Sequence, residues 1–186
     1  MNAKGKYHTV VIKPTCYVGE LDNNDVLFLW TEIPGATSPR GTSMLRNIQI
    51  IDYDDAGADI DLFFSQTKDA DATVTGALGA ASSIGNLTDA EVRTLKPLTR
   101  FMIDYSGITS GEMHNFTQGY TGYYSANSEG VNSSWLRGFP VWSHEATQAQ
   151  IDAGNANPGS IYVMAEASAT KTYSANGITL ALTFES

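Results

Sequence analysis

The segment RNIQIIDYDDAGADIDLFFSQ, residues 46–66, places a cluster of aspartates between two alternating apolar patterns. Alternation with a period of two is typical of β-strands that bury one face. The sequence therefore predicts strands near 45–53 and 59–66, paired antiparallel through a turn at 54–57. The side chains that share the apolar faces of these strands are Ile48, Ile50, Ile60, Leu62 and Phe64.

The aspartates of this segment have three interpretations. A calcium loop of the EF-hand type would need an acid at its twelfth position, which is Phe63 when counting starts at Asp52. A pair of catalytic carboxylates, as in glycoside hydrolases, is a second interpretation. We favour the third, in which the aspartates form a turn and an acidic outer face that points to solvent or to a partner. The residues concerned are Asp52, Asp54, Asp55, Asp59 and Asp61.

Further short apolar runs, separated by turn residues, occur along the whole chain. They predict strands over 6–13, 23–35, 98–107, 160–168 and 177–186. In the last of these, Ile178, Leu180, Leu182 and Phe184 share the face expected to be core. Residues 86–97 give the one good helix signal, and 147–159 predict a turn of helix or a loop. The pattern indicates a mainly β chain, an antiparallel β-sandwich or a jelly-roll-like barrel with one short helix.

We expect residues 1–186 to form a single domain. Within it, residues 107–145 differ in composition from the rest. This stretch is rich in glycine, serine, asparagine and aromatic residues, and it predicts a long ordered excursion. Aromatic side chains on loops can anchor a protein interface, stack on sugars or form a small core of their own. The candidate interface residues are Phe116, Tyr120, Tyr123, Tyr124, Trp135, Phe139 and Trp142.

The run from Ile50 to Phe64 also resembles sequences of small structural proteins of tailed bacteriophages. The other matching pieces are 87–95, 160–167 and 177–184, so the resemblance covers roughly residues 40–105 and 158–186. Residues 107–145 do not fit it. The resemblance implies a virion component, such as an auxiliary decoration protein on the capsid surface that is synthesised in the host cytoplasm. It carries no catalytic signature, so no site residue is transferred from it.

The charge and composition of the chain argue against several classes of function. A formal net charge of −9 argues against nucleic-acid binding, which needs a basic face, and against adhesion to an anionic membrane. The single cysteine, Cys16, excludes an internal disulfide, and the N-terminus lacks the apolar core of a secretory signal. The histidines His8, His114 and His144 stand in no metal-ligand spacing. We therefore expect no metal and no cofactor.

Two functions from different classes remain. The first is a non-enzymatic virion protein that binds the major capsid protein and other virion proteins. We expect such a protein to be a homo-oligomer. Its contacts would use sheet edges, the N-terminal segment and the aromatic excursion. The second is a carbohydrate-binding β-sandwich, in which the aromatic residues stack on sugars. A glycoside hydrolase that uses a pair of the clustered aspartates is a third, weaker possibility.

Overall fold

The computed structural model describes residues 6–23, 25–54, 56–68, 93, 95–103, 139–167 and 170–186. Within these residues the chain is mainly β, with ten strands and one short helix. The strands are β1 (Tyr7–Ile12), β2 (Gly19–Leu21), β3 (Asp25–Ile33), β4 (Thr42–Asp52), β5 (Ile60–Ser65), β6 (Pro97–Ile103), β7 (Phe139–Trp142), β8 (Ile161–Ala167), β9 (Lys171–Tyr173) and β10 (Ile178–Glu185). The helix is α3 (Gln148–Asp152).

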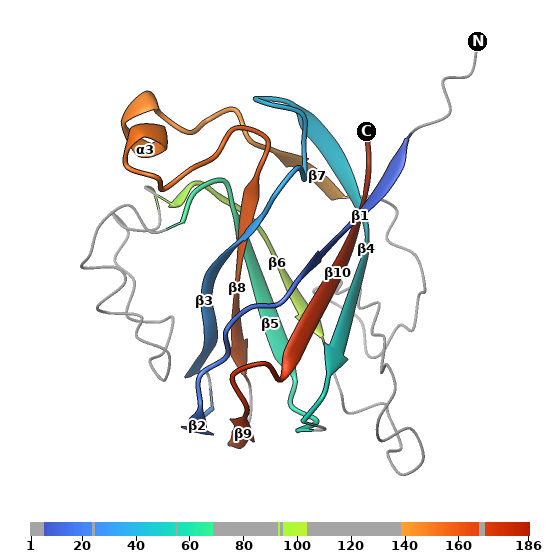
Figure 1. The fold of residues 1–186 in the computed structure, drawn as a ribbon, viewed down its shortest axis with the longest axis vertical. Coiled ribbons are helices and arrows are strands. Elements are labelled where there is room, and N and C mark those ends of the chain that lie inside the picture. The colour runs from blue at the N-terminus through green and yellow to red at the C-terminus, as the bar shows by residue number, and fades with distance from the viewer. Residues whose placement is uncertain are drawn as a thin grey trace.

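The strands form two four-stranded sheets and one small ribbon. The first sheet has the order β1-β10-β4-β7 and the second has the order β3-β8-β5-β6. Every neighbouring pair in both sheets is antiparallel. In Figure 1, β3, β8, β5 and β6 lie side by side while β10 and β4 run obliquely beside them. The β2-β9 ribbon lies at the lower end in that view, and α3 lies at the upper end.

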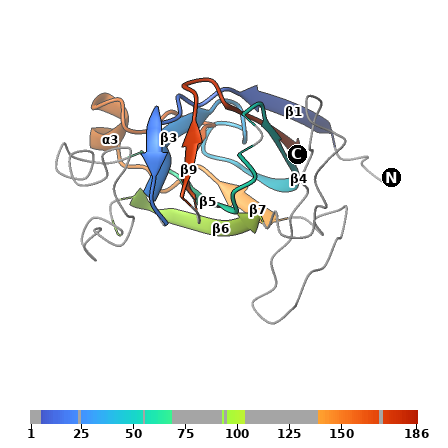
Figure 2. The same ribbon diagram turned by 90° about the horizontal axis from the view of Figure 1, so that it is seen from below.

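Successive strands pass from one sheet to the other, which gives the connectivity of a jelly roll. Strand β3 belongs to the second sheet, β4 to the first, β5 and β6 to the second, β7 to the first, β8 to the second and β10 to the first. Jelly rolls are built in this way from two Greek keys. Figure 2, turned by 90°, shows β5 and β6 toward one side of the molecule and β1 toward the other. The predicted antiparallel β-sandwich is confirmed.

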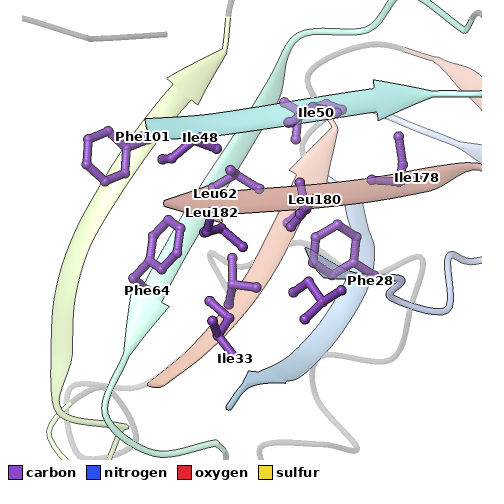
Figure 3. Packing of buried hydrophobic residues seen from close by; sticks show 14 of the residues in the cluster. Phe28, Ile33, Ile48, Ile50, Leu62, Phe64, Phe101, Ile178, Leu180 and Leu182 are labelled. Carbon is purple, nitrogen blue, oxygen red and sulfur yellow. The ribbon is translucent and has the colours of Figure 1, made fainter. Parts of the chain in front are cut away.

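The core lies between the two sheets. Figure 3 shows side chains of β4 and β10 meeting side chains of β3, β5 and β6. Burying one large aliphatic or aromatic side chain contributes about 1.5–3 kcal/mol, so this layer is the main source of stability. The apolar faces predicted from alternation are all fully or almost fully buried: Ile48, Ile50, Ile60, Leu62, Phe64, Ile178, Leu180, Leu182 and Phe184.

The predicted hairpin between the two aspartate-flanked strands is wrong, although both strands exist. Strand β4 pairs with β10 and β7, whereas β5 pairs with β6 and β8. Residues 52–59 lead from β4 to β5 and cross from one sheet to the other; we refer to them as the crossing segment. Alternation reports which face of a strand is buried, and it does not report the partner strand. Two strands that each bury one face satisfy the same pattern when they lie in opposite layers.

The structure differs from the predicted excursion at its C-terminal end. Residues 139–142 form β7, which pairs with Thr42–Leu45 at the edge of the first sheet. A four-residue strand containing Pro140 gives little signal in the sequence, because proline is confined to sheet edges. The three-residue strands β2 and β9 were likewise not predicted. Most of the helix expected at 86–97 and most of the excursion lie outside the described residues; residues 93 and 95 are helical, and Pro97 begins β6.

Helix α3 shows that, of the two alternatives left open for 147–159, a turn of helix is present. Thr147 is its N-cap, and its hydroxyl accepts a hydrogen bond from the backbone N–H of Gln150. The Gln150 side chain accepts in turn from the backbone N–H of Thr147 at 3.0 Å. This reciprocal capping box satisfies two backbone donors that a short helix would otherwise leave free.

Candidate functional site

Strand β1 forms one edge of the first sheet. It pairs with β10 along its whole length, from Tyr7 opposite Glu185 to Ile12 opposite Leu180. The described sheet has no strand on the other side of β1. An edge strand presents unpaired backbone groups, which can pair with a strand from another chain.

Large apolar side chains are exposed along this edge. Tyr7 is 59% exposed, Val11 60% and Val18, in the link that follows β1, 65%. The fourth exposed large apolar residue in the described part of the chain is Tyr53, at 58%. Three of the four therefore belong to one segment of twelve residues, 7–18. We refer to Tyr7, Val11 and Val18 together as the N-terminal edge.

A groove of about 670 Å³ lies beside the same segment, between the link that follows β1 and strand β3. Its volume is within the range of small-ligand sites. Lys13 provides the one charged side chain in its lining, while Tyr17 and Trp30 provide aromatic rings. The lining residues are Lys13, Pro14, Thr15, Cys16, Tyr17, Val18, Leu29, Trp30 and Thr31.

Two candidate reactive groups near this edge have structural roles. The Cys16 side chain is buried, and burial raises the pKa of its thiol to about 11. A thiol with so high a pKa is protonated and unreactive at neutral pH. His8 stacks on Phe184, with 5.6 Å between ring centroids, and its Nε2 lies 2.8 Å from the carbonyl oxygen of Gly35. His8 thus fastens β1 to the loop after β3.

The aspartates of the crossing segment hold the backbone. The carboxylate of Asp52 accepts hydrogen bonds from the N–H groups of Asp54, Ala56 and Gly57, at 3.0, 3.0 and 3.4 Å. Burial raises the pKa of Asp52, and these backbone donors act in the opposite direction. The carboxylate of Asp54 instead binds Ser174. The turn interpretation of these two residues therefore fits the structure, although the turn joins two sheets. Asp55 lies outside the described residues.

Asp61 is predicted to lie on an acidic face that points to solvent or to a partner, but it does not point to solvent. It is buried on the outer face of the second sheet, where Arg100 of β6 forms an ion pair with its Oδ2 atom. The residue directly opposite it on β8 is Glu166, which is also buried. Sequence reasoning missed Glu166, because only the β5–β8 register brings the two carboxyl groups together.

Two of the seven candidate interface aromatics are described by the structure. Phe139 packs edge-to-face on Phe101, with 5.6 Å between centroids, and so extends the core. Trp142 is half-buried, and its Nε1 donates to the Glu145 carboxylate at 3.3 Å. The ring of His144 lies 6.4 Å from that of Trp142. Phe116, Tyr120, Tyr123, Tyr124 and Trp135 lie outside the described residues, as does His114.

The described residues contain no group of three or more histidine, cysteine, aspartate or glutamate side chains placed to hold a metal ion. Among the same residues, no helix has the length and apolar character needed to cross a membrane. Comparison with protein-family models, curated proteins and solved structures gave no match for this chain. Function must therefore be argued from the geometry.

Proposed function

We propose that this chain is a structural, non-enzymatic component of a tailed-phage particle. It binds the assembled capsid and stabilises it through protein–protein contacts, in the manner of a decoration protein. The observation that carries this proposal is the N-terminal edge, where Tyr7, Val11 and Val18 are exposed along an edge strand and the link that follows it. The resemblance of Ile50–Phe64 to structural phage proteins supports the same class.

The chemistry of the N-terminal edge suits contact with another protein chain. Large apolar side chains that are exposed along one strand and the link after it suit contact with a partner, because water solvates them poorly. An edge strand adds backbone hydrogen bonds to that apolar contact when an extended segment pairs with it. The partner in this proposal is the major capsid protein, and a second copy of the chain could form a homo-oligomer through the same edge.

The net charge of −9 supports a position on the outside of the particle. A protein that packs against the genome must neutralise phosphate groups with lysine and arginine, and this chain has 11 of these residues against 20 acidic ones. The acidic surface would be repelled by the enclosed nucleic acid. On the outer surface, the same charge favours solubility of the particle.

The test compares capsid binding by two matched variants. One replaces Tyr7, Val11 and Val18 by serine, and the other replaces Tyr53 alone, which is equally exposed but lies in the crossing segment. Co-sedimentation with purified capsids and the melting temperature of the loaded particles are measured. We expect the triple variant to lose binding and the Tyr53→Ser variant to retain it.

Truncation of one anchor residue that is buried at an interface costs about 2 kcal/mol or more of binding free energy. This corresponds to a roughly thirtyfold loss of affinity. A triple variant that binds and stabilises capsids as well as the unaltered chain would show that the N-terminal edge is not the contact. Absence of the chain from purified virions would refute the structural function itself.

A second candidate function is carbohydrate binding, and the groove is the observation that favours it. Tyr17 and Trp30 both line the groove, and aromatic rings stack on the apolar faces of sugars. A glycan array probed with the purified chain and with a Trp30→Ala variant tests this function. Glycan binding that disappears in the variant would support it, and an array without any signal would exclude it.

A further inference from the structure

Asp61 and Glu166 face each other across two neighbouring strands on the outer face of the second sheet. The antiparallel register places Asp61 of β5 directly opposite Glu166 of β8. Directly opposed side chains in such a pair lie about 4.5–5.5 Å apart at their Cβ atoms. The residues are 2% and 3% exposed, so both carboxyl groups are largely removed from water.

The surroundings of this pair are mostly apolar. Val26 is opposite Glu166 on the other side of β8, and it forms a small buried cluster with Met164. Phe63 packs against this cluster, and the guanidinium carbon of Arg100 lies 5.3 Å from the centre of the Phe63 ring. An ionised carboxylate in such a place loses hydration that apolar neighbours do not replace.

Only one of the two carboxylate oxygens of Asp61 has a hydrogen-bond donor among the described residues. Arg100 pairs with Oδ2 of Asp61, while Oδ1 of Asp61 is buried and has no hydrogen-bond partner among the described residues. A buried acceptor without a donor is costly, and natural structures contain few of them. The nearest group in the strand register that could supply a donor is the carboxyl of Glu166 in its protonated form.

The charges that face the pair favour a bound proton. Arg100 of β6 is the cation, and against it stand Asp61, Glu166 and Asp25, from β5, β8 and β3. Two ionised carboxylates beside one guanidinium would leave an uncompensated negative charge on groups that are largely removed from water, although the Arg100 side chain itself is half exposed. The other titratable groups farther along this face are Tyr162 of β8 and Glu32 of β3, which accepts hydrogen bonds from Ser160 and Asn157.

We propose that Asp61 and Glu166 share one proton, carried by the Glu166 carboxyl and donated to Oδ1 of Asp61, and that this shared proton makes the β5–β8 contact sensitive to pH. The inference concerns the isolated chain and does not depend on the proposed function. Removal of the proton leaves two adjacent carboxylates that repel each other. The outer face of the second sheet is then the part of the sandwich that loses stability.

The direction of the pH dependence follows from the titration of Glu166. The pKa of Glu166 is raised from 4.5 to about 7, mainly by burial and also by the charges of Asp61 and Asp25, while Arg100 opposes the increase. The folded chain therefore keeps a proton that the unfolded chain has already released between these two pH values. Stability is greatest at the acidic end of this window and falls as pH rises, by up to about tenfold in the unfolding equilibrium constant per pH unit.

The experiment measures urea unfolding between pH 4.5 and 8 for the unaltered chain, Glu166→Gln and Glu185→Gln. The glutamine amide donates to Asp61 at every pH, so we expect Glu166→Gln to lose the decline in stability across this window. Glu185 pairs with Arg46 on the first sheet, and its substitution should leave the decline in place. All other titratable groups are shared by the unaltered chain and Glu166→Gln, so their contributions cancel in that comparison.

A direct readout keeps the proposal open to refutation if Glu166→Gln fails to fold. Carboxyl-carbon NMR of the unaltered chain should show one glutamate that titrates near neutral pH. In Asp61→Asn this resonance should titrate at lower pH, because the neighbouring negative charge is gone. A chain in which every glutamate titrates near its ordinary value would overturn the proposal. An equal decline in stability for Glu166→Gln and the unaltered chain would overturn it as well.

Discussion

The carboxylate of Asp54 accepts hydrogen bonds from the backbone N–H of Ser174, at 2.6 Å, and from the Ser174 hydroxyl, at 2.9 Å. Asp54 belongs to the segment that crosses from β4 to β5, and Ser174 belongs to the turn between β9 and β10. The bond therefore joins two connections that are 120 residues apart in the sequence. In the same place, the N–H of Tyr53 donates to the carbonyl oxygen of Gly177 at 2.8 Å.

This contact predicts that Gly177→Ala is destabilising. A Cβ atom at residue 177 would lie 2.0 Å from Oδ2 of Asp54, so the carboxylate must move and give up its bonds to Ser174. We expect a loss of about 1 kcal/mol in the free energy of unfolding, the usual contribution of a hydrogen bond at a solvent-accessible site. Chemical denaturation measures it.

The control for Gly177→Ala is the same substitution in an Asp54→Ala background. There the clash with the carboxylate is absent and the 3.2 Å contact with the carbonyl oxygen of Ser174 remains, so alanine should cost less than in the unaltered chain. Equal effects of Gly177→Ala in the two backgrounds would show that the Asp54 carboxylate is not the cause.

Calcium should leave the melting temperature of this protein unchanged. The carboxylates of Asp52 and Asp54 bind backbone N–H groups and Ser174, and no acid stands at the closing position that calcium loops use, since residue 63 is phenylalanine. Thermal unfolding with millimolar calcium and with a chelator measures this. A rise in melting temperature that depends on calcium would revive the metal interpretation of the segment.

Asp52→Ala should destabilise the crossing segment. The substitution removes the acceptor of three backbone N–H groups, an effect comparable to removal of a helix N-cap, which costs about 0.5–2 kcal/mol. Asp22→Ala, at an exposed position before β3, is the matched control and should change stability by less than about 0.5 kcal/mol. Similar effects of the two substitutions would contradict the role assigned to Asp52.

The last strand provides a sharper contrast between neighbouring positions. Leu182 is fully buried in the core, while Thr183 is half-buried on the other face and bonds the hydroxyl of Thr9. Leu182→Ala should cost roughly 2–5 kcal/mol because it leaves a cavity, and Thr183→Ala should cost much less. Denaturant midpoints measure both. Equal losses would mean that β10 presents the wrong face to the core.

The faces of the strands could be predicted from sequence, and the partners of the strands could not. Ile178 to Phe184 alternate so regularly that their buried face follows from periodicity alone. The pairing of β10 with both β1 and β4 depends on residues more than a hundred positions away. Local patterns carry no information on such contacts, and for this reason the crossing segment was interpreted as a hairpin.

Less of the candidate site follows from local patterns. The N-terminal segment was expected to take part in contacts, and the structure shows that its apolar residues are exposed. The pair formed by Asp61 and Glu166 could not be predicted, because it exists only in the β5–β8 register. Asp61 stands at a position that alternation assigns to the outer face, and this assignment is correct. Its burial is a tertiary effect that no local pattern reports.

The position of β10 in the first sheet has a consequence for synthesis on the ribosome. This strand lies between β1 and β4, so neither of them has its main partner until the chain up to Glu185 has left the exit tunnel. Pairing between the two ends of a chain is slow, because a long loop must close first. Until β10 is available, the nascent chain has unpaired edges on β1 and β4. Unpaired strand edges are prone to aggregate, so the late arrival of β10 makes this sheet the vulnerable part of the chain during synthesis.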